Sequence, residues 1–437
     1  MVLMIKIICS LCLILTLSHF ANAQDKGRKP NPIVQGKNKD RLSNNVMHTL
    51  PLKAVIADHK TGSDGNYVRT RVISTVSPAV VRQNDPKGPR YQEGIGYTFL
   101  LNSPKYPGLC ILDDGTLVLT LTAALSGEIV KRKGVTYVDE NTRTDVILFS
   151  RDNGKSWSQP LRIPGYRTTP MNLGGKRLLL RGWASKYDVP ETYRFWFSQD
   201  GGKTWSKEEK VAALPDGRRP ITDVSPNMLI EGDTIRFMFY ARGGTLMRPY
   251  NHVQRKWGKP YSFPKSWMDM ARCSEASITR AKNGDLVGSF RSSRPDIPAP
   301  SDHWRGIVTA RSTDNGKTWT RPQVHSLYGH VHHTLLTLPD GRILMTYAAR
   351  LGELDGKLYH GHEAVISHDH GKTWDWKRRF ILFRGTDGAM HSPRSVLMRN
   401  GRVFTIFMHP VSYTWRDKQT RGNLIALSNV SAVIWKP

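Results

Sequence analysis

The sequence predicts an all-β fold, a six-bladed β-propeller, and two repeating patterns carry this prediction. One is the segment SxDxGKTW or a close variant of it, which occurs four times. The other is a glycine-containing turn between two apolar runs, which occurs six times at an almost constant period. A pattern that recurs at a fixed period indicates a repeat architecture, in which each repeat is one supersecondary unit.

The glycine turns predict the number of units. They contain Gly115, Gly174, Gly232, Gly284, Gly341 and Gly401, at intervals of 59, 58, 52, 57 and 60 residues. A unit of this length accommodates four short strands with their turns. Six such units arranged radially form a propeller that leaves few exposed sheet edges.

The SxDxGKTW segments each predict a tight hairpin turn. They begin at Ser150, Ser198, Ser312 and Ser367, which are 48, 114 and 55 residues apart, so one unit in the middle lacks the motif. In each copy we expect the Asp to accept hydrogen bonds from the turn, the Gly to supply a positive φ and the Trp to anchor the next strand. These Asp residues are therefore expected to hold the fold rather than to carry chemistry.

The N-terminal region predicts a secreted or periplasmic protein. Residues 1–23 contain Lys6, an apolar run too short to span a membrane and a small-residue ending, so they read as a signal peptide cleaved after Ala23. Residues 24–50 are polar and predict a flexible lead, and residues 51–437 the propeller. Within it, 53–57 and 70–81 are strand candidates, and one of them is expected to close the ring by completing the last blade.

The charge of the chain predicts anionic partners. There are 64 Lys and Arg residues against 36 Asp and Glu, a formal net charge of +28. A secreted protein this basic is expected to bind acidic or sulfated oligosaccharides and polysaccharides. No nucleic-acid-binding module is recognisable, so no specific nucleic acid is predicted, and no cofactor is implied.

One face of the propeller is expected to carry the site. The segments that lead into the inner strands share this face with the long loops expected at 124–143, 291–305 and 350–362. The leading segments are polar or cationic and lie at 105–107, 167–169, 223–225, 272–275, 330–333 and 391–394. From them and the neighbouring loops the sequence predicts a substrate-binding set of Arg291, Arg394, Lys105, Tyr106, Arg350, His330 and Arg272.

The SxDxGKTW repeat resembles the Asp box, and with six units the chain resembles the BNR-repeat propeller of the sialidase superfamily over most of its mature length. This resemblance implies a secreted glycosidase, sialidase-like and exo-acting. The stretch SEASITRAKNGDLVGSFRSS resembles the family pattern, which implies that Glu275 modulates a nucleophile and Arg291 binds a sugar carboxylate. The alternative is that Glu275 is simply an ion-pair partner of Arg272 or Arg291. The chain departs from the pattern where Lys105 replaces an arginine and where 391–394 replace the segment with the nucleophilic tyrosine.

Histidines stand where the nucleophile is missing. We therefore predict Glu275, His332, His391 and Asp139 as the acid, base or nucleophile, with Asp139 protonating the leaving oxygen in a hydrolase. Two alternatives stay open. A lyase would use His, Tyr and Arg for β-elimination on a uronate-containing glycan, and a non-catalytic propeller would only bind it. A metal site at 330–333 is disfavoured, because on a regular strand His330 and His332 share a face while His333 points away.

Overall fold

The protein is described here by a computed structural model. The described residues are 53–56, 72–99, 104–124, 129–132, 135–138, 143–184, 193–217, 228–241, 244–264, 274–292, 305–326, 329–385, 391–412 and 427–437. They lie within one compact unit, residues 42–437, and form an all-β fold. Among them, no helix is long and apolar enough to cross a membrane.

Four antiparallel sheets follow one another along the chain, each ordered from its innermost strand outward. The first contains β4 (Lys105–Ile111), β5 (Leu117–Ala124), β8 (Arg143–Ser150) and β9 (Leu161–Ile163). The second contains β10 (Tyr166–Asn172), β11 (Leu178–Trp183), β12 (Arg194–Ser198) and β13 (Glu209–Lys210). The third contains β14 (Leu229–Glu231), β15 (Thr234–Ala241), β16 (Gly244–Asn251), β17 (Lys256–Trp257) and β18 (Tyr261–Ser262). The fourth contains β19 (Ser274–Arg280), β20 (Leu286–Ser292), β21 (Gly306–Ser312) and β22 (Gln323–Val324).

The rest of the described chain forms a ten-stranded sheet and one small hairpin. One run of the large sheet is β23 (His330–Thr337), β24 (Ile343–Leu354), β25 (Lys357–Ser367) and β26 (Phe380–Gly385), with the 3-10 turn η4 (Trp376–Arg378) before β26. The other run is β27 (His391–Leu397), β28 (Val403–Ser412), β29 (Leu427–Trp435) and β3 (Arg90–Phe99). Strand β2 (Val72–Gln83) joins the runs and pairs with β1 (Lys53–Ile56), while β6 (Ile129–Arg132) and β7 (Val135–Val138) form the small hairpin.

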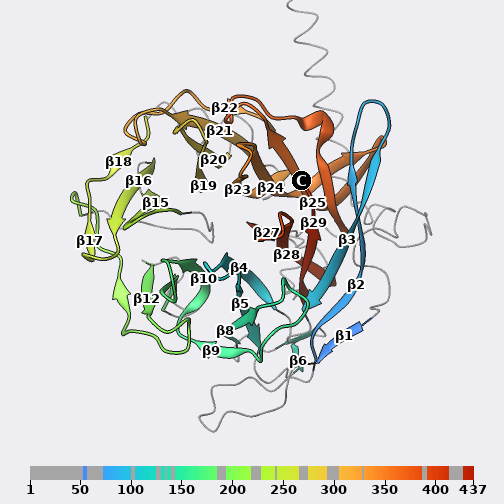
Figure 1. Cartoon of the computed structure of the whole chain (residues 1–437), viewed down its shortest axis with the longest axis horizontal. Coiled ribbons are helices and arrows are strands. Elements are labelled where there is room, and N and C mark those ends of the chain that lie inside the picture. Colours follow the sequence, from blue (N-terminus) through green and yellow to red (C-terminus); the bar gives the residue numbers. More distant parts are fainter. Residues whose placement is uncertain are drawn as a thin grey trace, which may run out of the picture. The chain divides into compact units, whose positions relative to one another are not determined.

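The innermost strands surround a common centre, which gives the propeller-like arrangement of Figure 1. Strand β4 contacts β10, β23 contacts both β19 and β27, and β27 contacts β4. Side chains from neighbouring sheets interlock between them. For example, Leu119 and Phe404 share one apolar cluster with Phe99, whose ring meets Trp157 edge-on at 5.2 Å. Each sheet therefore buries its faces against its neighbours in the ring.

Residues 53–57 or 70–81 were expected to complete the last blade and close the ring, and this prediction was wrong. The closing strand is β3, which pairs with the C-terminal strand β29. Most of the candidate 70–81 lies in β2, which instead pairs with β3 and with β26. The candidate 53–57 corresponds to β1, which contacts only β2 through its ladder among the described residues.

The prediction of a long loop at 350–362 was also wrong. These residues belong to a long hairpin, since β24 and β25 remain paired to a turn at Asp355 and Gly356. Asp355 there accepts two hydrogen bonds from Arg82 of β2, at 2.7 and 2.8 Å. Residues 124–143 include the small hairpin of β6 and β7.

The predicted glycine turns join the inner strand pairs. Gly115, Gly174, Gly232, Gly284, Gly341 and Gly401 all have positive φ, from 55° to 94°. Each lies between the first two strands of a ladder, as between β4 and β5 or between β27 and β28. The turn chemistry read from the sequence therefore matches the backbone at all six positions.

The four SxDxGKTW segments share one pattern of hydrogen bonds. In the third copy the hydroxyl of Ser312 donates to Asp314, and the amide and hydroxyl of Thr318 donate to the same carboxylate. These bonds, led by that from the Thr318 hydroxyl, lower the pKa of Asp314 to about 2. The carboxylate is fully used within the turn, as expected from the sequence.

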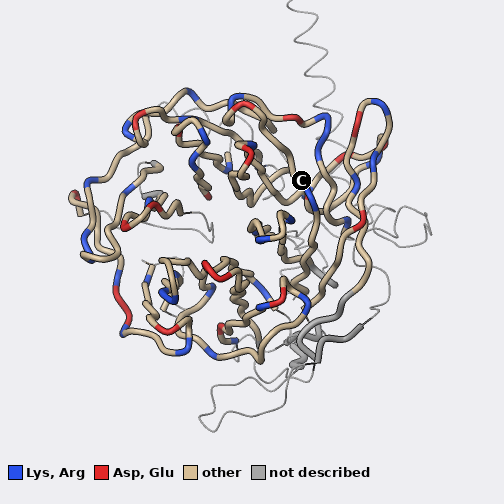
Figure 2. Tube along the Cα trace, in the orientation of Figure 1, with Lys and Arg blue, Asp and Glu red and all other residues tan. Residues whose placement is uncertain are grey.

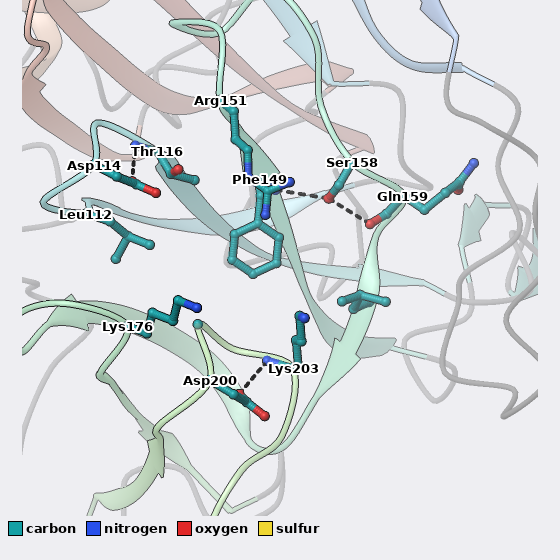
Figure 3. Close-up of a pocket in the computed structure, with 12 residues that line it drawn as sticks. Leu112, Asp114, Thr116, Phe149, Arg151, Ser158, Gln159, Lys176, Asp200 and Lys203 are labelled. Atoms are coloured by element: carbon teal, nitrogen blue, oxygen red, sulfur yellow. Dashed lines mark hydrogen bonds between the residues drawn. The ribbon is translucent and has the colours of Figure 1, made fainter.

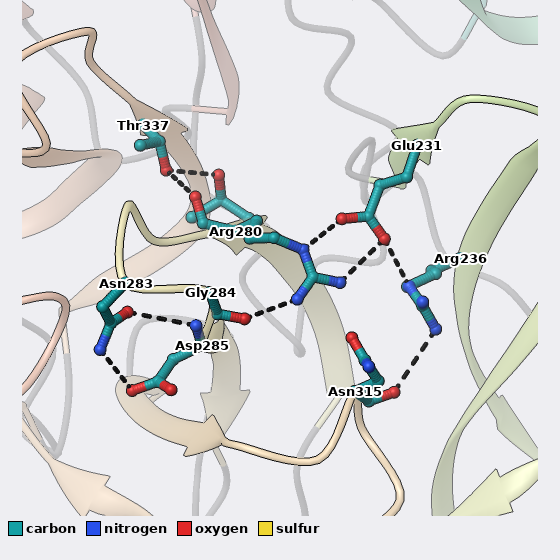
Figure 4. A network of polar contacts seen from close by, with 9 residues as sticks. Glu231, Arg236, Arg280, Asn283, Gly284, Asp285, Asn315 and Thr337 are labelled. Atoms are coloured by element: carbon teal, nitrogen blue, oxygen red, sulfur yellow. Dashed lines mark hydrogen bonds and ion pairs between the residues drawn. The ribbon is translucent and has the colours of Figure 1, made fainter.

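Ion pairs link adjacent sheets near the turns (Figure 4). Glu231 of β14 accepts hydrogen bonds from Arg280 of β19 and, at 2.7 Å, from Arg236 of β15. The carbonyl oxygen of Arg280 accepts from the Thr337 hydroxyl of β23 at 2.7 Å. One carboxylate thus ties the third sheet to the fourth, and the fourth is tied to β23. Basic residues elsewhere are spread over every sheet (Figure 2).

Candidate functional site

The same irregularity occurs where five inner strands begin. In β4, β10, β19, β23 and β27, two residues stand opposite one residue of the partner strand, which is a β-bulge. The first residue of each bulge has a positive φ although it is not glycine: Tyr106 (50°), Arg167 (53°), Glu275 (44°), His332 (52°) and Ser392 (54°). We call these five the bulge positions.

The bulge positions are strained and equivalent. A non-glycine residue in this region of φ costs on the order of 1–3 kcal/mol, and such strain is concentrated at functional sites. In β4 and β27 the second bulge residue is Pro107 or Pro393, which has no amide hydrogen to donate and therefore suits an unpaired position. The inner strands that carry these positions contact one another around the ring, β10 with β4, β4 with β27, β27 with β23 and β23 with β19.

Glu275 is held between an arginine and a histidine. Arg291 of β20 forms an ion pair with its Oε1, and Nδ1 of His332 lies 3.2 Å from its Oε2. All three side chains are buried: Glu275 is 4% exposed, Arg291 8% and His332 9%. The predicted partnership of Glu275 with Arg291 is present, and His332 joins it from the neighbouring inner strand.

Arg350 extends this group to a second histidine. Its Nη2 lies 3.0 Å from Nε2 of His332 and 3.0 Å from Nε2 of His391. The two imidazole rings are 4.5 Å apart at an interplanar angle of 42°. Arg291, Glu275, His332, Arg350 and His391 therefore form one connected group, which we call the central cluster.

The contacts assign the tautomer of His332. A guanidinium can only donate hydrogen bonds, so Nε2 of His332 must accept from Arg350 and carries no proton. With Nε2 accepting, the proton of a neutral ring is on Nδ1, which lies 3.2 Å from Oε2 of Glu275; that oxygen is buried and makes no hydrogen bond among the described residues. A carboxylate in this place can hold an imidazole by charge, while the other ring nitrogen can take up a proton.

His391 is neutral as well. Burial, and next the positive charge of Arg350, lower the pKa of His391 well below its usual range. A histidine in this state can accept a proton or a hydrogen bond but is a poor proton donor near neutral pH. The central cluster therefore has two neutral imidazoles, and its positive charge comes from arginine.

The bulge separates His332 from the other histidines of β23. His333 points away from the cluster, with Nδ1 2.7 Å from the Ser289 hydroxyl, and burial lowers its pKa to about 3. His330 packs its ring against Tyr347 and Trp376, so the structure does not bring this predicted binding residue to the cluster. The alternation expected of a regular strand, with His330 and His332 on one face, fails here because of the bulge.

Arg394, Lys105 and Tyr106 lie at the inner strands but outside the central cluster. Arg394 is buried and donates to the carbonyl oxygen of Pro393 at 2.7 Å. Tyr106 supports the guanidinium of Arg167, whose Cζ lies 3.9 Å from the ring centroid. Lys105 pairs in register with Thr122 at the start of β4. Asp139 and Arg272 lie outside the described residues.

Three polar groups near the bulges were missed by sequence reasoning. Arg167 and Ser392 lie in leading segments that were recognised as polar, but neither was selected. Ser392 is 1% exposed, and its hydroxyl has no hydrogen-bond partner among the described residues. Asp145 is fully buried in β8 and was not considered, although a single Asp in the apolar run DVILF was a usable signal.

A cavity of about 430 Å³ lies apart from the central cluster, at the turns between the first and second sheets (Figure 3). It is lined by the other ends of the strands, including Asp114, Lys176, Asp200 and Lys203. Among the described residues, no group of three His, Cys, Asp or Glu side chains is placed to hold a metal ion.

Comparisons with solved structures agree with the fold. A protein of unknown function from Dyadobacter fermentans has a TM-score of 0.53 and 19% identity, covering 76% of this chain and 95% of its own. An α-L-arabinofuranosidase from Fusarium graminearum has a TM-score of 0.51 and 15% identity, covering 76% and 93%. The NanB sialidase from Streptococcus pneumoniae has a TM-score of 0.53 and 13% identity, covering 77% and 68%.

The sequence itself identifies the family. No curated protein matches the chain. The family model described as a BNR repeat-like domain matches residues 178–405, a little more than half of the sequence, from β11 to β28. Together with the all-β, propeller-like structure, this match confirms the resemblance drawn from the repeats. The chain belongs to the BNR repeat-like family.

Proposed function

We propose that this protein is a secreted, sialidase-like glycoside hydrolase that releases a terminal acidic sugar from an anionic glycan. The observation that carries this proposal is the central cluster, in which Arg291, Glu275, His332 and Arg350 form one buried chain of contacts beside His391. Strained backbone at Glu275 and His332 supports a functional rather than a packing role.

The arginines favour an anionic sugar. Arg291 on β20, Arg350 on β24 and Arg394 on β27 are all buried. After burial itself, the charges of Arg291 and Arg394 also lower the pKa of His333. A guanidinium fork donates two parallel hydrogen bonds to a carboxylate, which a neutral sugar does not offer. The substrate we propose is therefore a sugar with a carboxylate, bound with that group towards Arg350 and Arg291.

The roles follow from which atoms are already engaged. Glu275 has Arg291 at one oxygen and His332 at the other, so it orients His332. Without substrate, Arg350 donates to Nε2 of His332. A sugar carboxylate that accepts the N–H groups of Arg350 would release Nε2 to take up a proton from water or from the sugar. Asp139 remains our candidate for protonation of the leaving oxygen.

A second candidate reaction is β-elimination on a uronate-containing glycan. The observation that favours it is the neutral state of His332 and His391 beside Arg350. Elimination needs a base for the proton next to the carboxylate, and a cation that neutralises this carboxylate. His332 and Arg350 satisfy both requirements, whereas hydrolysis by the usual route needs a second carboxyl group.

We also propose three finer features of the chain. The ten-stranded sheet counts as two blades bridged by β2, which gives six blades in all. The four SxDxGKTW turns are Asp boxes, which their shared hydrogen bonds support. Residues 1–23 direct secretion and are removed.

Product analysis tests the proposal. The mature protein would be incubated with sialylated, uronate-containing and sulfated oligosaccharides, and the products weighed by mass spectrometry. Products whose summed mass includes one added water establish hydrolysis. Products without that water that absorb in the ultraviolet establish elimination. Binding without any product would contradict catalysis and leave a glycan-binding propeller.

Variants separate catalysis from binding. Glu275→Gln and His332→Gln should each lower kcat by at least about a hundredfold, because they remove the oriented base. Arg291→Glu should abolish binding of the acidic substrate. Glu208→Gln, at a half-exposed carboxylate paired with Arg194, is the matched control and should change neither quantity. Unchanged turnover in Glu275→Gln or Arg291→Glu would contradict the assigned roles.

A further inference from the structure

Three of the five bulge positions, Tyr106, Arg167 and Ser392, have no role in the proposed chemistry. Glu275 and His332 belong to the central cluster, but Tyr106 and Arg167 have the same strained conformation on β4 and β10. These two strands contact each other, and β4 also contacts β27. Tyr106 and Arg167 therefore continue the ring of bulge positions beyond Ser392, away from the central cluster.

Arg167 is surrounded by aromatic rings. Its Cζ lies 3.9 Å from the ring centroid of Tyr106, 5.3 Å from that of Trp183 and 5.4 Å from that of Tyr166. Contacts of this kind fix a guanidinium by cation–π attraction. The N–H groups of a guanidinium point outward in its own plane, so stacking on its face is compatible with binding a planar or tetrahedral anion at its edge.

A buried carboxylate fixes the backbone beside Arg167. Asp145 of β8 is fully buried and accepts hydrogen bonds from the amide and the hydroxyl of Thr168, both at 2.6 Å. It also accepts from the Thr122 hydroxyl at 2.6 Å. Thr168 is the second residue of the bulge whose first residue is Arg167. By these hydrogen bonds Asp145, in the first sheet, fixes the bulge of β10 that contains Arg167.

We infer that Arg167 is a second anion-binding residue of the site, stacked on Tyr106 and positioned by Asp145. It binds a carboxylate or sulfate on a sugar unit next to the one that occupies the central cluster. This inference rests on the proposed function, because it requires a glycan at the inner ends of the strands. It adds a substrate class: oligosaccharides with acidic groups on at least two successive units.

The test compares a ligand with one acidic group and a ligand with several. Binding of galacturonate, of trigalacturonate and of a trisaccharide that carries sulfate esters but no carboxylates would be measured by titration calorimetry on the mature protein. Arg167→Gln should weaken trigalacturonate by at least about tenfold, the loss of a charge-assisted hydrogen bond, and galacturonate by less than about twofold. The sulfated trisaccharide shows whether sulfate replaces carboxylate at this position.

Further variants separate a binding role from a structural one. Arg167→Lys keeps the charge but loses the two-pronged donor of the guanidinium, so it should lose less trigalacturonate affinity than Arg167→Gln. If Arg167→Gln does not fold, Arg167→Lys tests whether Arg167 binds the second acidic group. Asp145→Asn should weaken trigalacturonate selectively, as expected of a positioning residue. Arg162→Gln removes an equal charge at an exposed position of β9 and should leave both affinities unchanged.

The outcomes are distinguishable. If wild-type protein binds galacturonate and trigalacturonate but folded Arg167→Gln or Arg167→Lys keeps the wild-type ratio of the two affinities, the role of Arg167 is overturned while the proposed function stands. Equal weakening of both ligands would also overturn it, since it would point to a general disturbance of the site. If wild-type protein binds none of the three ligands but cleaves a sialylated oligosaccharide, this inference is overturned while the proposed function stands; if it neither binds these ligands nor cleaves any acidic glycan, both fail.

Discussion

Acidification should destabilise the protein through its buried histidines. His333 and His362 are fully buried, and burial lowers the pKa of each from 6.5 to about 3. In the unfolded chain both take up protons as the pH falls below about 6.5, whereas in the folded chain they remain neutral down to about 3. The unfolded state therefore binds more protons in this window, and stability is lost as the pH falls.

The size of the effect follows from these values. At pH 5.5 each histidine is almost fully protonated in the unfolded chain and neutral in the folded one. Relative to pH 7.5, this lowers the free energy of unfolding by about 1.4 kcal/mol per histidine. His333 and His362 together should lower the free energy of unfolding by about 3 kcal/mol. This is a large fraction of the 5–15 kcal/mol typical of a folded domain.

Urea unfolding followed by tryptophan fluorescence at pH 7.5 and 5.5 measures this loss. His362→Phe, which keeps a ring against Phe407, and His333→Gln should each reduce the loss by about 1.4 kcal/mol, whatever their effect at a single pH. The exposed His368, changed to Gln, is the control and should leave the loss unchanged. If the free energy of unfolding falls by the same amount between pH 7.5 and 5.5 in the wild type and in both buried variants, the argument from burial is refuted.

Three other predictions concern different parts of the chain. Asp314→Ala should lower the midpoint of thermal unfolding, because it removes the hydrogen bonds of one turn, while glycan binding stays unchanged; altered binding would argue against a purely structural Asp. Glu363→Gln should destabilise by about 3 kcal/mol or more, because the buried carboxylate pairs with Arg379 and accepts from two tyrosine hydroxyls; a wild-type denaturation midpoint would contradict this. Intact-mass measurement of the exported protein should give Gln24 as the first residue, and any other start would correct the cleavage prediction.

The sequence was sufficient for the repeats because their chemistry is local. Turn glycines with positive φ and an Asp that bonds its own turn depend on a few adjacent residues. Ring closure was missed because it depends on residues far apart. Strand β3 has the sequence RYQEGIGYTF, whose glycines weaken a strand prediction. Gly94 is needed there, since a Cβ would lie 2.7 Å from the carbonyl oxygen of Ile434 in the partner strand β29.

The site was predicted in part for a related reason. Glu275 and Arg291 follow from the resemblance, and the abundance of histidine and arginine in the leading segments follows from reading the repeats in register. Which histidine contacts Glu275 does not follow, because alternation along a strand assumes regular pairing. The bulge at His332 breaks that pairing, and no glycine marks it. A backbone conformation unfavourable for its own residue leaves no signature in the sequence.

The five bulge positions share one backbone conformation but carry different side chains on the two sides of the ring. All five residues share a positive φ at the first position of a bulge, although their side chains differ in type. One arc carries Glu275 and His332, whose Oε2 and Nδ1 lie 3.2 Å apart, and the other carries Tyr106 and Arg167, which stack on each other. Ser392 stands between them. A propeller with this ring would hold an acidic glycan across its centre, with the base at one sugar and the stacked cation at the next.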